Sequence, residues 1–124
     1  MKPRIHIKRV YDPPAKDDGL RILVDRVWPR GKKKEEVHLD DWWKELAPST
    51  ELRKWFNHDP DSWEVFRESY EEELNTNRKA LESALQSLLK DHPKTLTLLY
   101  SAHDTEHNQA IVLRDFLQKL LNKH

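Results

Sequence analysis

Three short segments carry the hydrophobic patterns of β-strands. Residues 5–10 alternate apolar and polar side chains, which is the period of a strand with one buried face. Residues 22–24 form a continuous apolar run, Ile-Leu-Val, which is typical of a strand covered on both faces, as in a parallel sheet. Residues 95–100, Thr-Leu-Thr-Leu-Leu-Tyr, form the third predicted strand.

A first helix is predicted soon after the second strand. Asp40 or Asp41 is a good N-cap, because an aspartate side chain accepts a hydrogen bond from a free amide of the first turn. We expect this short helix to carry Trp42, Trp43 and Leu46 and to end before the next proline.

Further helix starts follow along the chain. Ser49 is expected to cap the next turn, and Asp59 followed by Pro60 is a strong helix start. Residues 63–89 then carry apolar side chains at helical spacing, interrupted at residues 75–77. This pattern indicates two helices or one kinked helix.

The order of these elements predicts an α/β fold. A final helix is expected from about Glu106 to Asn122, after the third strand. The long helical connection between the second and third strands is a crossover, so these two strands should be parallel. We therefore expect residues 1–124 to form a single layered domain, a small three-stranded, at least partly parallel sheet flanked by helices.

The composition limits the classes of function. The 124 residues include no cysteine, which favours a reducing compartment and excludes thiolate chemistry, and no apolar run is long enough for a membrane span. We therefore expect a cytoplasmic protein that does not bind membranes. Lysine plus arginine equals aspartate plus glutamate, 22 each, so binding to nucleic acid is not favoured. Two glycines are too few for a multi-glycine phosphate loop.

Four blocks of the sequence carry a family resemblance. They are Arg-Val-Tyr-Asp-Pro at residues 9–13, Leu-Val-Asp-Arg-Val-Trp-Pro-Arg-Gly at residues 23–31, Lys-Trp-Phe-Asn-His-Asp-Pro at residues 54–60, and Leu-Tyr-Ser-Ala-His-Asp at residues 99–104 with His-Asn-Gln-Ala at residues 107–110. Together they resemble the YeaO-like branch of the domain-of-unknown-function family 488. The resemblance implies a small α/β domain of bacteria and archaea without an established activity.

The resemblance also has one departure. In longer members of that family, the third strand is followed by a cysteine-containing segment and by the sequence Cys-His-Arg. This chain has Ser101 and His107-Asn108 in the comparable region and no cysteine. Thiol or cysteine–metal chemistry is therefore not carried over to it.

Polar side chains follow each of the three predicted strands. In open parallel sheets, ligands bind at the carboxyl ends of the strands, so these side chains should converge on one site. The candidates are Tyr11 after the first strand, Asp25, Arg26, Trp28 and Arg30 after the second, and Ser101, His103 and Asp104 after the third.

Asp25 and Arg26 have two interpretations. They end an apolar strand, where a charge is either paired or faces a cavity. In the first interpretation, the two side chains form an internal ion pair. In the second, Arg26 binds a phosphate or carboxylate through its two-pronged guanidinium, with help from Arg30, and Asp25 acts as a base or orienting group.

The segment before the last helix also has more than one interpretation. His103 and His107 are four residues apart, but they straddle a predicted loop, so no metal site is expected. Asp104 or Thr105 is the expected N-cap of the helix. Alternatively, free amides of the first turn, with Ser101, His103, His107 and Asn108, form an anion site that Arg26 approaches.

The aromatic residues in the middle of the chain have two interpretations, of which packing in the core is the main one. The tryptophans between Trp42 and Trp63 are expected in the core, with a wall for base stacking as the alternative. His58 is expected to be exposed, with Asp59 as a helix cap.

Together these patterns give two hypotheses of function. The first is a protein that binds a phosphorylated or anionic metabolite, such as a nucleotide, with acid/base hydrolase or transferase chemistry by Asp25, His103 or Asp104. The second is a non-catalytic module that binds nucleic acid or a protein through the basic loop at residues 30–34. The sequence identifies no cofactor.

Overall fold

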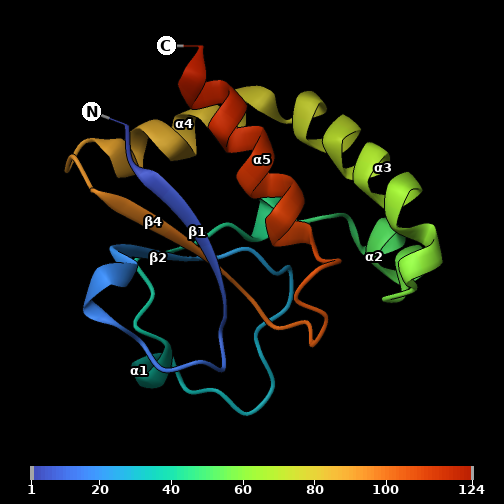
Figure 1. The fold of residues 1–124 in the computed structure, drawn as a ribbon, viewed down its shortest axis with the longest axis horizontal. Coiled ribbons are helices and arrows are strands. Elements are labelled where there is room, and N and C mark those ends of the chain that lie inside the picture. Colours follow the sequence, from blue (N-terminus) through green and yellow to red (C-terminus); the bar gives the residue numbers. More distant parts are fainter. Residues whose placement is uncertain (1, 124) are drawn as a thin grey trace.

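The computed structural model describes residues 2–123 and contains one four-stranded parallel sheet (Figure 1). The strands are β1 (Arg4–Arg9), β2 (Leu20–Leu23), β3 (Asp41–Trp42) and β4 (Thr95–Tyr100), in the spatial order β1-β4-β2-β3. β4 is central and pairs in parallel with both β1 and β2. The predicted α/β class and the parallel arrangement of the second and third predicted strands are confirmed, but the prediction of three strands is wrong.

The additional strand, β3, replaces the helix start predicted at Asp40 or Asp41. The Trp43 amide donates to the Leu23 carbonyl at 2.9 Å, so this segment continues the ladder of β2. The Asp41 carboxylate accepts from the Trp43 indole at 2.9 Å and does not cap a helix. Sheet pairing therefore outweighs the local capping preference, and only a short 3₁₀ helix, Lys44–Leu46, follows.

Five α-helices complete the fold of residues 2–123. They are α1 (Lys34–Val37), α2 (Thr50–Phe56), α3 (Trp63–Thr76), α4 (Arg78–Leu89) and α5 (Gln109–Asn122), with further 3₁₀ turns at Lys16–Asp18 and Pro60–Ser62. Ser49 caps α2, as predicted, by accepting from the Leu52 amide at 3.2 Å. Asp59 caps the turn that leads into α3, and the predicted interruption separates α3 from α4.

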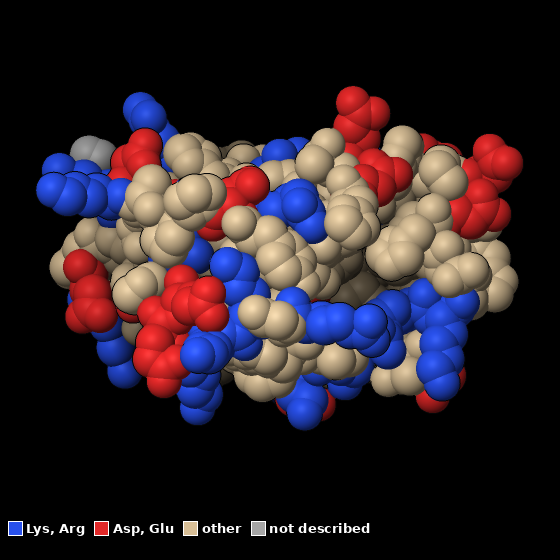
Figure 2. Space-filling model, turned by 90° about the horizontal axis from the view of Figure 1, so that it is seen from below, with Lys and Arg blue, Asp and Glu red and all other residues tan. Residues whose placement is uncertain are grey.

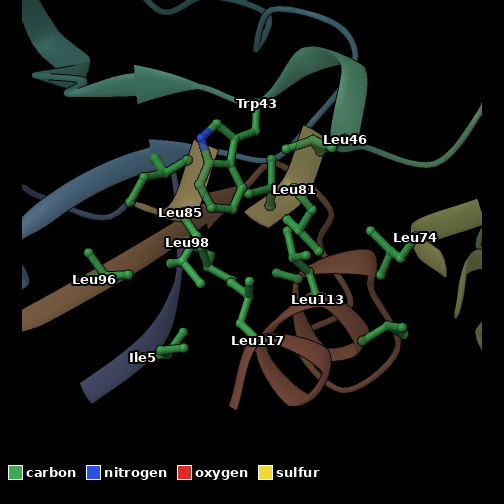
Figure 3. Packing of buried hydrophobic residues seen from close by; sticks show 14 of the residues in the cluster. Ile5, Trp43, Leu46, Leu74, Leu81, Leu85, Leu96, Leu98, Leu113 and Leu117 are labelled. Carbon is green, nitrogen blue, oxygen red and sulfur yellow. The ribbon is translucent and has the colours of Figure 1, made fainter. Parts of the chain in front are cut away.

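The main core lies between one face of the sheet and the helices. α5 packs on β1 and β4 and against α3, which lies to its right in Figure 1. In Figure 3, Leu113 and Leu117 of α5 point toward Leu96 and Leu98 of the sheet and toward Trp43. These side chains are almost fully buried, and burial of each leucine contributes roughly 1.5–3 kcal/mol to folding.

A smaller cluster covers the opposite face of the sheet. Val10, Leu23, Val37 and Leu99 are buried there, with Trp28 and other half-buried side chains packed around them. The segment that connects β2 to β3 supplies this cover. Consequently the loop after β2 is held against the sheet and stands beside the carboxyl ends of the strands.

The tryptophans differ in their environments. Trp43 is 3% exposed and belongs to the core, whereas the Trp55 side chain on α2 is 53% exposed. The prediction that this stretch is core is therefore wrong for Trp55, whose side chain is largely open to solvent. No helix in residues 2–123 is long and apolar enough to cross a membrane.

Candidate functional site

A cavity of about 590 Å³ opens at the carboxyl edge of the sheet. Its lining comes from the ends of β1, β2 and β4, from α2 and the turn after it, and from the first residues of α3 and α5. Figure 2 views the molecule from this side, and a hollow to the right of the centre is bordered by Lys and Arg side chains. The structure thus places the ends of three strands around one concavity, as the parallel topology requires.

Seven of the ten residues proposed from the sequence line this cavity. They are Tyr11, Asp25, Arg26, Trp28, Arg30, Ser101 and His103. The remaining three, Asp104, His107 and Asn108, lie outside its lining, in the loop before α5.

Asp25 forms the innermost polar group of the cavity. It is 8% exposed, and one of its carboxylate oxygens accepts from both the backbone amide and the hydroxyl of Ser101, the amide at 3.0 Å. The other oxygen accepts from the side-chain amide of Gln109. Burial raises the pKa of the Asp25 carboxyl, although the hydrogen bonds from Ser101 lower it in part. Asp25 therefore joins the ends of β2 and β4 to the first turn of α5.

Arg26 does not pair with Asp25, so the interpretation of an internal ion pair between them is wrong. Its Nε donates to the Pro48 carbonyl at 2.9 Å and its Nη2 to the Ala47 carbonyl at 3.0 Å. The remaining Nη1 lies 3.7 Å from the carboxylate of Glu45. All three guanidinium nitrogens thus have a partner, so Arg26 contributes positive charge to the cavity but does not offer two free donors to a ligand.

Arg9, at the end of β1, is also held by backbone carbonyls. Its guanidinium donates to the carbonyls of Ala102, at 2.9 Å, and Ser101, at 3.2 Å. It also lies over the ring of Tyr11, 5.0 Å from the centroid, and the Tyr11 hydroxyl donates to the Arg30 carbonyl at 2.9 Å. These contacts fix the loop after β2 against the end of β1.

Arg30 and Arg53 are the cavity arginines whose guanidinium groups make no hydrogen bond or ion pair within residues 2–123. Both residues are exposed, Arg30 after β2 and Arg53 in the last turn of α2. Sequence reasoning missed Arg53, because nothing in the pattern of α2 indicated which of its polar residues would face the strand ends. With Arg9 and Arg26, they place four arginines around a cavity whose lining contains one carboxylate, that of Asp25.

Two histidines also line the cavity. His103, in the loop after β4, and His58, after α2, are both exposed, as predicted for His58. His58 has a backbone φ of 56° and follows Asn57, whose φ is 45°. Two consecutive non-glycine residues in the left-handed region form an uncommon turn, and this turn aims the imidazole along the cavity wall.

The loop before α5 is held by hydrogen bonds among its own residues. The Asp104 carboxylate accepts from the amides of Glu106, at 2.9 Å, and His107, at 3.0 Å, and its other oxygen lies 3.0 Å from the His107 ring. The hydrogen bond from the Glu106 amide is the largest cause of the lowered pKa of Asp104. Asp104 is therefore a turn former outside the cavity.

The last helix begins three residues later than predicted. Asn108 is its N-cap and accepts from the Ile111 amide at 3.2 Å, so the prediction that Asp104 or Thr105 caps the helix is wrong. Asp104 occupies the amides of residues 106 and 107 and Arg26 donates to backbone carbonyls, so these donors of the predicted anion site are already engaged. Within the described residues, no group of three or more histidine, aspartate or glutamate side chains is placed to hold a metal ion.

Comparison with known proteins identifies the family. The family described as "Inactive DUF488-N3 subclade" matches residues 4–124 of this chain. The chain belongs to the DUF488 family. This confirms the resemblance seen in the four sequence blocks.

The curated relatives of this DUF488 chain are themselves uncharacterized. Protein YeaO of Escherichia coli (strain K12) is 50% identical over 116 residues, which cover 94% of this chain and 98% of YeaO. Protein Rv3073c of Mycobacterium tuberculosis (strain H37Rv) is 44% identical over 72 residues, 58% of this chain and 61% of that protein. No solved structure matches this chain.

Proposed function

We propose that this protein is a cytosolic binder of a small phosphorylated or otherwise anionic metabolite, which it holds in the cavity without turning it over. The observation that carries the proposal is the charge of the cavity. Four arginines and two histidines line it against the single carboxylate of Asp25, and that carboxylate already accepts three hydrogen bonds. An anion entering a partly enclosed site of this kind meets a field that water screens less than at an open surface.

Arg30 and Arg53 are the residues proposed to contact the anion directly. Their guanidinium donors are free to form the paired hydrogen bonds that phosphate and carboxylate oxygens accept. Arg9 and Arg26 stand behind them as fixed charges, held by backbone carbonyls. His103 adds a third hydrogen-bonding group at the edge of the cavity.

Three features support binding without catalysis. The carboxylate of Asp25 accepts three hydrogen bonds, from the amide and hydroxyl of Ser101 and from Gln109, and these give it a structural role. The chain has Ser101 in the region where the family resemblance implies a cysteine, and with no cysteine it offers no thiol nucleophile. The family description itself contains the word inactive.

Binding of nucleic acid through the loop at residues 30–34 is less well supported. Glu35 and Glu36 follow the three lysines directly, and Lys32 lies 4.0 Å from the carboxylate of Glu36. The loop is therefore of mixed charge, whereas nonspecific binding to a phosphate backbone requires a basic surface. The cavity, in contrast, encloses a volume suited to a small molecule.

Calorimetric titration with pyrophosphate tests the proposal. Arg30→Gln and Arg53→Gln should each weaken binding about 10-fold or more, because a hydrogen bond to a charged group contributes roughly 1.5–3 kcal/mol. Arg78→Gln is the matched control, since Arg78 lies on α4, outside the cavity, and pairs with Glu82 at 2.9 Å. Equal weakening by all three substitutions, or no binding to the unsubstituted protein, would contradict the proposal.

A further inference from the structure

The cavity is larger than an inorganic anion requires. Its volume of about 590 Å³ lies within the range of roughly 300–1,000 Å³ that is typical of small-molecule sites. Apolar side chains, among them Val27, Trp28, Phe56 and Phe66, share the lining with the arginines. The occupant that fills this space therefore has an apolar body in addition to its anionic group.

The wall formed by α2 and α3 is aromatic. Phe56 and Phe66 stack with their ring centroids 4.2 Å apart and their planes at 20°. The ring of His58 lies 6.3 Å from that of Phe56. Phe56 and Phe66 are buried while His58 is exposed, so the wall runs from the floor of the cavity to its mouth.

The turn after α2 brings a ring and a cation to the same wall. The Asn57 amide donates to the Arg53 carbonyl at 3.0 Å, which ends α2, and His58 follows in a second left-handed conformation. This backbone conformation is rare for residues with a side chain and folds the chain back toward Phe56.

We infer that the ligand is an anion that carries a planar aromatic ring, of the nucleoside monophosphate class, and that His58 is a binding residue for that ring. The inference rests on the proposed function and adds to it the part of the ligand that does not reach the arginines. The phosphate binds to Arg30 and Arg53, and the ring lies against His58 at the mouth of the aromatic wall. Stacking on such a wall tolerates any base, because every base has a flat π face.

Calorimetric titrations with four probes separate the two parts of this inference. The probes are inorganic phosphate, ribose 5-phosphate, adenosine 5′-monophosphate and unphosphorylated adenosine. Adenosine 5′-monophosphate should bind about 5- to 150-fold more tightly than ribose 5-phosphate, which is the range expected for one stacked base. Adenosine alone should bind more weakly than adenosine 5′-monophosphate, because it lacks the group that Arg30 and Arg53 bind.

His58→Asn removes the ring and keeps a residue that tolerates the left-handed conformation. It should lower the affinity for adenosine 5′-monophosphate toward that for ribose 5-phosphate and leave the latter within twofold. His92→Asn is the matched control, because His92 is also exposed, has a φ of 50° and lies outside the cavity lining.

The outcomes distinguish this inference from the function on which it rests. If ribose 5-phosphate and adenosine 5′-monophosphate bind equally well, the cavity binds an anion but the aromatic ligand class is wrong. If His58→Asn weakens both probes equally, His58 contacts the phosphate and not a ring, which also overturns the inference. If none of the three phosphates binds, the proposed function itself is wrong.

Discussion

Replacing Asp25 tests whether the hydrogen bonds of its carboxylate stabilise the contact between the strand ends and α5. In Asp25→Ala, the backbone amide of Ser101 loses its acceptor, which lies at 3.0 Å in the native protein. Ser101 and Gln109 are partly exposed, so the hydroxyl and the side-chain amide can rotate toward water, whereas the backbone amide is fixed at the end of β4. We expect the free energy of unfolding to fall by about 1–3 kcal/mol, the cost of one buried unsatisfied donor.

Asp25→Asn is the informative partner of this substitution. Its carbonyl oxygen still accepts from Ser101, and a flipped Gln109 amide can accept from its nitrogen. Burial raises the pKa of Asp25 above its unfolded value, so the carboxyl contributes stability below the unfolded pKa, which is lost as the pH rises through the folded pKa. The asparagine variant should therefore gain stability relative to the native protein as the pH rises from about 4 to 7.

Urea denaturation followed by circular dichroism at several pH values measures both effects. Asp115→Ala is the control, because Asp115 is a partly exposed aspartate of α5 that pairs with Arg67 at 3.2 Å and should cost less than about 1 kcal/mol. An Asp25→Ala variant as stable as the native protein would refute the reasoning. So would an asparagine variant that loses more stability than the alanine variant.

Three further substitutions test the framework around the site. Gly19→Ala should lower the free energy of unfolding in urea by more than about 1 kcal/mol, because Gly19 has a φ of 65° and an added Cβ would lie 2.1 Å from the Thr95 carbonyl oxygen; an unchanged midpoint would contradict this. Asn108→Ala removes the cap that accepts from the Ile111 amide and should cost about 1–2 kcal/mol in the same assay, whereas Asn108→Ser keeps a capping oxygen and should restore part of the loss. Burial raises the pKa of Asp18, but hydrogen bonds from a backbone amide, a lysine and an arginine outweigh burial and lower the pKa overall. The melting temperature of the native protein should therefore exceed that of Asp18→Asn above about pH 4. This difference in melting temperature should disappear as the pH falls through the lowered pKa. A difference that persists unchanged at pH 2 would exclude this ion cluster as its source.

The parts of the fold that were predictable are those in which local pattern and tertiary contacts agree. Residues 95–100 form β4 as predicted, because their run of apolar side chains matches the fully buried centre of the sheet. β3 has only two residues and shows no period, and it exists because its backbone completes the ladder of β2. Its neighbouring aspartates suit a helix cap equally well, so sequence reasoning chose the wrong element.

The same limit applies to the site. The topology of parallel strands was enough to predict that Asp25, Ser101 and His103 would meet, because all three follow strand ends. The partners of Arg26 were not predictable, since the carbonyls that bind it belong to residues 47 and 48, which no local pattern places beside it. Arg53 entered the site through the docking of α2, which is a tertiary event without a sequence motif.

An NMR titration of the ¹⁵N-labelled protein with pyrophosphate tests the central claim most directly. If the cavity binds anions, the side-chain Nε–Hε signals of Arg30 and Arg53 and the amide of His103 should shift with one shared saturation curve, while the Nε–Hε signal of Arg78 stays in place. The contrary result is the absence of saturable shifts, or shifts confined to the surface lysines of residues 32–34.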